Sequence, residues 1–157
     1  MAASIAEEFP EVGLERQDIR EYPGGALAAN VVGATGWDGH GLLGLEDSMD
    51  PVLAGTDGSR TYDRGSDGAV IPGSWRDQQP AIDGSTVELT LNSDIQYQVQ
   101  QQVQQAKNLS GAKNASAVVL DAKTGQVLAM SNDGTFDPSI GVGNNPADAQ
   151  MGNLAVS

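Results

Sequence analysis

The sequence has no cysteine, a single histidine and few aromatic residues, and each shortage excludes a kind of site. Without cysteine there is no disulfide, no thiol nucleophile and no thiolate metal ligand. The lone histidine, His40, lies between two glycines and has no identifiable partners for a catalytic triad or a metal site. We therefore interpret His40 as a structural or solvated residue.

Positive charge and long apolar runs are also scarce. The chain has 8 Lys and Arg residues against 21 Asp and Glu residues, a formal net charge of −13, so we expect no nucleic-acid partner. No apolar run approaches the roughly 20 residues that span a bilayer, and residues 1–10 lack the cationic and apolar regions of a secretory signal. Either the protein is cytosolic or its membrane anchor lies outside this sequence.

Apolar side chains suffice only for small ordered regions separated by loops. Leu, Ile, Val and Phe make up about a fifth of the 157 residues, whereas glycine is abundant with 20 residues. A short strand is expected at 12–15. Pro23 and the two glycines after it predict a tight turn in which Gly25 has a positive φ. Residues 26–34 fit a short helix and a buried strand equally well.

Residues 42–55 predict an interrupted helix, followed by an exposed module. Five apolar residues have the spacing of one helical face: Leu42, Leu45, Met49, Val52 and Leu53. Because Pro51 fits only the first turn of a helix, we expect a new turn with Ser48 as its N-cap. Residues 56–84 are rich in Gly, Asp and Pro and predict loops and short hairpin strands.

The second half has a more regular pattern. Alternating apolar residues predict a half-buried strand at 86–91. A helix follows, with an apolar stripe and a capping box formed by Ser93 and Gln96. Its seven glutamines are interpreted as a solvated face. The apolar stripe consists of Ile95, Val99, Val103 and Ala106.

Two apolar runs, at 117–120 and 127–130, predict a β-hairpin whose five-residue connection places Gly125 in the left-handed conformation. Strands that are apolar at consecutive positions are usually covered on both faces, so we expect the hairpin to belong to a helix-flanked sheet. After residue 133 the chain returns to Gly, Asn and Pro. We expect a flexible loop there.

Two short motifs imitate an active site without its context. Ser110 and Lys113 match SxxK, and residues 123–125 match KTG, the motifs with which penicillin-recognising enzymes activate a serine. However, Ser110 lies at the predicted end of a helix, the KTG lies in a hairpin turn, and no SxN triplet exists. The Asp-rich runs lack EF-hand spacing. We therefore expect no catalytic residue, no cofactor and no metal site.

Four segments, in the right order along the chain, resemble the class B penicillin-binding proteins. Residues 20–28, REYPGGALA, are similar to the family's RxYPxG-x-LA motif, and residues 41–55 to its GxxGxE…LxG segment. Residues 86–96 are similar to the start of its transpeptidase domain. Residues 117–139 are similar to its first hairpin and the DP-containing stretch after it. The septal, actinobacterial branch is the most similar.

The resemblance implies an α+β fold in which residues 1–84 are part of a non-catalytic pedestal of the dimerisation type and residues 85–157 begin the transpeptidase domain. The parent would be a membrane-anchored serine D,D-transpeptidase on the extracytoplasmic face, binding β-lactams and cross-linking peptidoglycan peptides in cell division. This chain would end before the nucleophile and be inactive alone. Its partners would be the remaining transpeptidase domain and division proteins.

The resemblance also assigns structural residues. Arg20 and Glu46 are expected to form an ion pair at the subdomain junction, because a buried charge must be paired. The alternative is that both are surface charges. The full motif comprises Arg20, Tyr22, Pro23, Gly25 and Glu46. A function outside the family also stays open at this point: an acidic extracellular module that uses its Asp-rich loops to bind calcium or a glycan.

Overall fold

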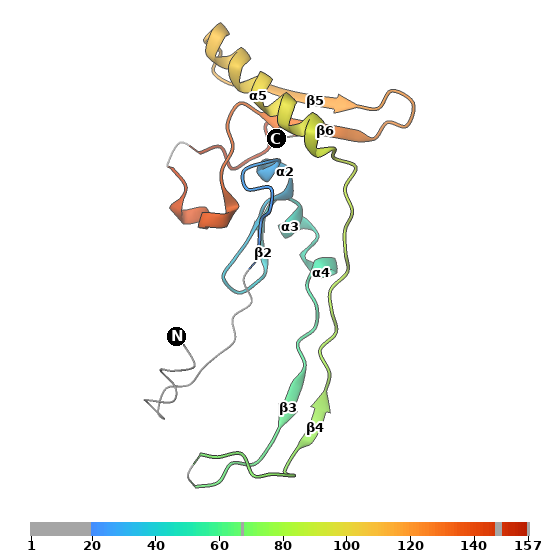
Figure 1. The fold of residues 1–157 in the computed structure, drawn as a ribbon, viewed down its shortest axis with the longest axis vertical. Helices are drawn as coiled ribbons and strands as arrows, with labels where there is room; N and C mark the ends of the chain where they lie inside the picture. The colour runs from blue at the N-terminus through green and yellow to red at the C-terminus, as the bar shows by residue number, and fades with distance from the viewer. Residues whose placement is uncertain (1–19, 67, 147–148, 157) are drawn as a thin grey trace.

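The computed structural model describes residues 20–66, 68–146 and 149–156, so the strand expected at 12–15 lies outside the described residues. Helices and strands are mixed, as an α+β fold requires. The strands form three separate two-stranded sheets, each antiparallel. Figure 1 shows an elongated molecule: a helix and a hairpin lie at one end, short helices occupy the middle, and a long arm extends to the other end.

The middle region consists of short elements. After the turn at 23–25, one helical turn (α2, Ala29–Val32) leads directly into a strand (β1, Ala34–Thr35), so residues 26–34 adopt both conformations that their sequence permits. β1 pairs with β2 (Gly41–Leu43). Two further short helices follow, α3 (Gly44–Ser48) and α4 (Asp50–Leu53).

The interrupted helix was predicted correctly in outline, but its details differ. Leu42 lies on a strand, and the N-cap of α4 is Met49, because the Ser48 hydroxyl donates to the Leu45 carbonyl instead. The buried residue of α3 is Glu46, whereas Leu42 and Val52 are exposed. The expected apolar face is therefore only partly correct: Leu45, Met49 and Leu53 are half-buried, but the buried side chain of α3 is charged.

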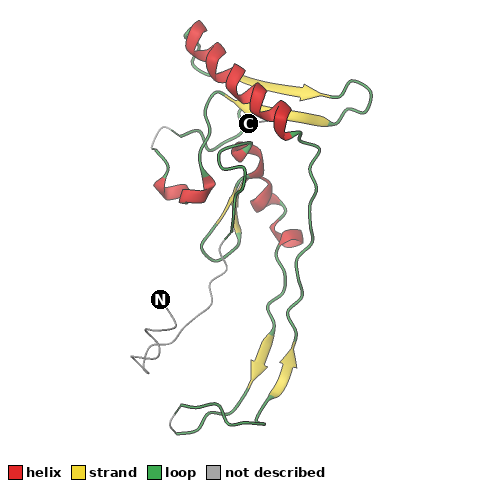
Figure 2. Ribbon diagram, viewed as in Figure 1, coloured by secondary structure: helices red, strands yellow, loops and turns green. Residues whose placement is uncertain are grey.

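The exposed module is a long two-stranded arm (Figure 2). Its strands are β3 (Ser59–Thr61) and β4 (Arg76–Gln79), and every residue in both is exposed. Isolated bridges between Thr56 and Ile82 and between Arg64 and Val70 extend the pairing toward the base and the tip. The prediction of short hairpin strands on an exposed module is confirmed.

The longest element is α5 (Ser93–Ser110), which ends at Gly111 in the left-handed conformation. Its N-cap is Asn92, whose side chain accepts hydrogen bonds from the amides of Asp94 and Ile95, so the predicted capping box is wrong. Of the predicted stripe, Val103 is buried and Ala106 is exposed. Within the described residues, no helix combines the length and apolar character needed to cross a membrane.

The β-hairpin is present: β5 (Ser116–Leu120) pairs with β6 (Val127–Asn132), and Gly125 has a φ of +75°. Its expected cover on both faces is absent from the described chain. The pattern of β5 alternates, with Val118 and Leu120 exposed, because α5 packs mainly on β6.

The strand predicted at 86–91 does not form. The segment is extended, and no described strand pairs with it. Hydrogen bonds from Thr90 and from Asn92, which follows the segment, connect it to β6. Alternating apolar residues predict where a strand can form, but pairing requires a neighbour.

Residues 134–146, which follow β6, are folded onto the middle region. Two 3₁₀ turns, Pro138–Ile140 and Val142–Asn144, follow Phe136, which is 2% exposed. Phe136 packs with Ala29 and Ala34 as the centre of the hydrophobic core. The expectation of a flexible loop is therefore wrong for the described residues, because Phe136 is buried and Thr135 and Gly152 are hydrogen-bonded to other segments.

Candidate functional site

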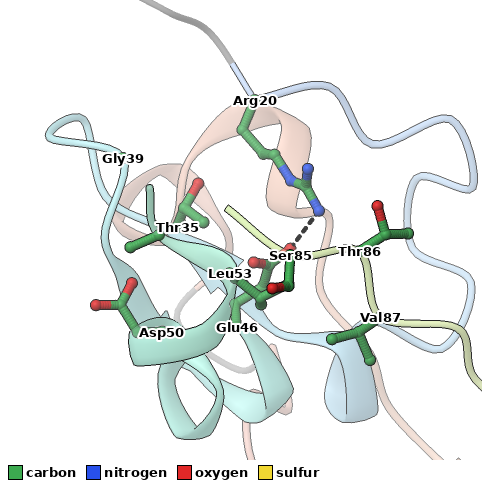
Figure 3. Close-up of a pocket in the computed structure, with 10 residues that line it drawn as sticks. Arg20, Thr35, Gly39, Glu46, Asp50, Leu53, Ser85, Thr86 and Val87 are labelled. Carbon is green, nitrogen blue, oxygen red and sulfur yellow. Dashed lines mark hydrogen bonds and ion pairs between the residues drawn. The ribbon is translucent and has the colours of Figure 1, made fainter. Parts of the chain in front are cut away.

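Arg20 and Glu46, two residues of the expected structural motif, line a cavity of about 300 Å³ beside α3 and the base of the arm (Figure 3). Arg20 Nη2 lies 2.7 Å from Glu46 Oε1. The Glu46 side chain is 7% exposed and that of Arg20 is 56% exposed. A buried carboxylate without a cation is costly, so Arg20 supplies the charge that permits Glu46 to be buried. Ser85, Thr86 and Val87 line the same cavity from the extended segment.

Tyr22 connects the turn to β1. Its hydroxyl accepts a hydrogen bond from the Thr35 amide at 2.8 Å and lies 3.1 Å from Thr35 Oγ1. The turn closes through the Gly25 amide, which donates to the Tyr22 carbonyl at 2.9 Å, and Gly25 has a φ of +52°. The motif therefore consists of a turn, a strand and an ion pair whose carboxylate is buried.

A second polar pair lies at the edge of this cavity. His40 Nδ1 lies 3.0 Å from Asp50 Oδ2, and Asp50 Oδ1 accepts from the Gly41 amide at 2.8 Å. The hydrogen bond and charge of Asp50, with the charges of Asp38 and Asp57, raise the pKa of His40 above its usual value. The Gly41 amide and then His40 lower the pKa of Asp50. The pair joins the β1–β2 turn to α4.

Gln96 and Gln100 were missed by the sequence analysis, which placed all seven glutamines in solvent. Gln96 is 1% exposed; its Nε2 donates to the Met130 carbonyl at 2.9 Å and its Oε1 accepts from the Met130 amide at 2.8 Å. Gln96 thus provides β6 with the donor and the acceptor that the backbone of a neighbouring strand would provide. The signal was available: Gln96, Gln100 and Val103 are spaced four and three apart, beside the apolar stripe.

Gln100 connects α5 to the middle region. Its Nε2 donates to the Ala26 carbonyl at 3.3 Å, and its Oε1 accepts from the Ala28 amide at 3.4 Å. The Thr135 hydroxyl also donates to the Ala26 carbonyl, at 3.0 Å. The backbone just before α2 is therefore hydrogen-bonded to two segments of the second half.

The C-terminal part makes similar connections. The side-chain amides of Asn30 and Asn132 both donate to the Gly152 carbonyl, at 3.2 and 2.7 Å. Lys107 pairs with buried Asp133. Burial raises the pKa of Asp133, but hydrogen bonds from Lys107 and the Ala115 amide outweigh it and keep the pKa below its usual range. These contacts join residues 20–50 to residues 92–146 and 149–156.

The structure places the two imitative motifs away from any catalytic arrangement. The Ser110 hydroxyl donates back to the Ala106 carbonyl at 2.8 Å in the last turn of α5. Residues 123–125 form the β5–β6 turn. No group of acidic or histidine side chains suitable for a metal ion occurs within the described ranges. The arrangement of the described residues supports positioning of two parts of a chain.

Comparison with known proteins relates this unit to the cell-wall enzymes. Residues 1–89 match the family model described as the penicillin-binding protein dimerisation domain. The chain is 72% identical over its whole length to penicillin-binding protein PbpB of Mycolicibacterium smegmatis, of which it covers 24%. It is 36% identical over 142 residues, 86% of the chain, to the probable peptidoglycan D,D-transpeptidase PenA of Neisseria gonorrhoeae, of which it also covers 24%.

Solved structures agree with these relatives. Penicillin-binding protein 3 of Mycobacterium tuberculosis, crystallised without ligand, matches with a TM-score of 0.73 and 64% identity, over 89% of this chain and 27% of that one. The same protein in complex with ampicillin matches with a TM-score of 0.72 and 63% identity, over 88% and 27%. The chain thus spans about a quarter of the length of its relatives. It belongs to the penicillin-binding proteins that carry this dimerisation domain.

Proposed function

We propose that this chain is the junction between the pedestal and the transpeptidase domain of a septal peptidoglycan D,D-transpeptidase. Residues 1–84 would be the later part of the pedestal and residues 85–157 the first helix and hairpin of the catalytic domain. The observation that carries the proposal is the core shared by Ala29 and Ala34 on one side of this boundary and Phe136 on the other.

In this role the chain would position the transpeptidase domain relative to the pedestal and would carry out no catalytic step. Arg20, Tyr22, Pro23, Gly25 and Glu46 would shape the pedestal side of the junction, and Gln100 would attach it to α5. A serine nucleophile and its lysine would come from other parts of the protein, because Ser110 is hydrogen-bonded into the end of a helix. The protein would act on peptidoglycan stem peptides and bind β-lactams, with division proteins as partners, on the extracytoplasmic face of the membrane.

A chimera tests the proposal. The matching 157 residues of PbpB from Mycolicibacterium smegmatis, 72% identical, are replaced by this chain in cells depleted of the native protein. We expect the chimera to be labelled by a fluorescent penicillin and to restore division. Arg20→Ala in the chimera should reduce labelling, because Glu46 would be buried without a cation, while Arg60→Ala on the exposed arm should leave labelling unchanged.

Two results would count against the proposal. A chimera that is stable but unlabelled would show that this span does not support the catalytic domain. Labelling of the isolated 157-residue chain that disappears on Ser110→Ala would show that the chain itself carries the nucleophile.

A further inference from the structure

A groove of about 940 Å³ lies where the arm leaves the middle region, next to the cavity of the structural motif. One wall is the β1–β2 turn, residues 37–40. The other is the base of the arm, where 53–57 and 81–84 run together through the Thr56–Ile82 bridge. Both walls are backbone segments fixed by hydrogen bonds, so the groove is part of the folded structure.

The lining of the groove is mostly polar, but it includes apolar side chains that are open to solvent. Trp37 is 85% exposed and Ile82 is 65% exposed, and both line the groove together with Leu53. Exposed tryptophan is costly in water and is enriched where proteins bind one another.

The rim of the groove is acidic, and its described residues carry more carboxylates than cations. Asp38, Asp57 and Asp83 line it, and no described Lys or Arg does. The basic group among the described lining residues, His40, is paired with Asp50 and also interacts with the charges of Asp38 and Asp57. Elsewhere in the described residues, Glu46, Asp63 and Asp133 each have an Arg or Lys partner. The groove therefore has negative charge that a cationic ligand would neutralise.

We propose that this groove binds an extended segment of another protein in which Lys or Arg alternates with apolar residues. The apolar side chains would cover Trp37 and Ile82, and the cations would lie against Asp57 and Asp83. This inference rests on the proposed function, in which the pedestal has protein partners, and names the chemistry of one such partner. Nucleic acid is excluded by the same carboxylates, which repel phosphate.

The chain has two tryptophans, so Trp75→Phe leaves Trp37 as the only one and makes its fluorescence a report on the groove. The 157-residue variant is titrated with a capped heptapeptide of alternating Lys and Leu. We expect a blue shift of the emission and saturable binding that weakens as salt is raised. The same peptide with Glu in place of Lys should produce no change.

Paired variants test the role of charge. Asp57→Asn with Asp83→Asn should weaken binding about tenfold or more, whereas Asp77→Asn with Glu88→Gln, which changes the net charge equally outside the groove, should not. Equal weakening by both pairs would overturn the proposal, and so would an equal response to spermidine, which is cationic without apolar side chains. Because these titrations use the isolated chain, their outcome is independent of whether the chimera divides.

Discussion

Gly24 and Gly25 are adjacent in the turn before α2 but differ in backbone conformation. Gly25 has a φ of +52°, and a Cβ there would contact nothing within 4 Å, so any cost of a side chain is due to the backbone alone. We expect Gly25→Ala to lower the free energy of unfolding by about 1 kcal/mol, because L-residues are disfavoured in this conformation. Urea denaturation measures the change.

Gly24 is the matched control. It does not lie in the left-handed region, and a Cβ there would lie 3.6 Å from Leu27 Cβ, an ordinary contact. Gly24→Ala should therefore change stability by less than about 0.5 kcal/mol. Equal effects at both positions would contradict the assigned role of Gly25.

The titration of His40 is the second prediction for a single residue. Because Asp50, Asp38 and Asp57 favour its charged form, the folded pKa lies above the unfolded value. The pair thus contributes stability that is fully present below about pH 6.5 and is lost as the pH rises through the higher folded pKa. His40 is the only histidine, so proton NMR follows it directly.

The variant that tests this is Asp50→Asn. Without the carboxylate, the pKa of His40 should fall toward its usual value, while Asp77→Asn on the arm should leave it unchanged. A His40 pKa that is the same with and without Asp50 would show that the pair is not formed in solution.

At the scale of elements, the contact between α5 and β6 depends on Gln96. Gln96→Ala would leave the amide and carbonyl of Met130 without partners, and we expect a loss of about 2 kcal/mol or more. Gln98→Ala, on the exposed side of the same helix, should cost less than about 0.5 kcal/mol. The Met130 amide should also exchange faster in Gln96→Ala; unchanged exchange would contradict the role of this side chain.

Elements that depend on local sequence were predictable. The α5 helix and the β5–β6 hairpin follow from periodicity and from the glycine in the turn, because their hydrogen bonds join residues close in sequence. The segment at 86–91 has an equally regular alternation of apolar and polar residues, yet it forms no strand. Its pairing depends on a neighbouring strand that this alternation does not encode.

The site was predictable only in part. The family's motifs pointed to Arg20 and Glu46, and the structure places these two side chains in contact. Gln96 and Phe136 were assigned to a solvated face and to a flexible loop. A sequence pattern always counts glutamine as a polar residue. The burial of Gln96 depends on the backbone of Met130, 34 residues away, which offers both a donor and an acceptor.

At the scale of the whole molecule, the hairpin leaves apolar side chains in water. Val118 and Leu120 are exposed on β5, and no described segment pairs with its outer edge. We expect the isolated chain to self-associate through β5, or else to exchange its amides at 116–120 quickly, because an uncovered sheet edge recruits another strand. Sedimentation velocity over a range of concentrations, with hydrogen exchange, measures both.

Val118→Thr with Leu120→Thr keeps strand-forming side chains while removing apolar surface, and should shift the chain toward monomer. Val52→Thr, also at an exposed apolar position, is the control and should not. A monomer with slow exchange throughout residues 115–131 would show that this half needs no further cover.

The contact of Gln96 with Met130 also sets how many neighbours the hairpin can accept. Thr90, Asn92 and Gln96 occupy the outer edge of β6, so only β5 is free to pair. A hairpin with one free edge can pair with one further hairpin, so its assembly ends at a pair of copies. Removing Gln96 alone would free only the amide and carbonyl of Met130, because Thr90 and Asn92 would still be bonded to this edge. Loss of all three contacts would give the hairpin a second free edge, and units with two free edges add without limit. The hydrogen bonds of Thr90, Asn92 and Gln96 with β6 would thus limit the self-association of this chain to pairs.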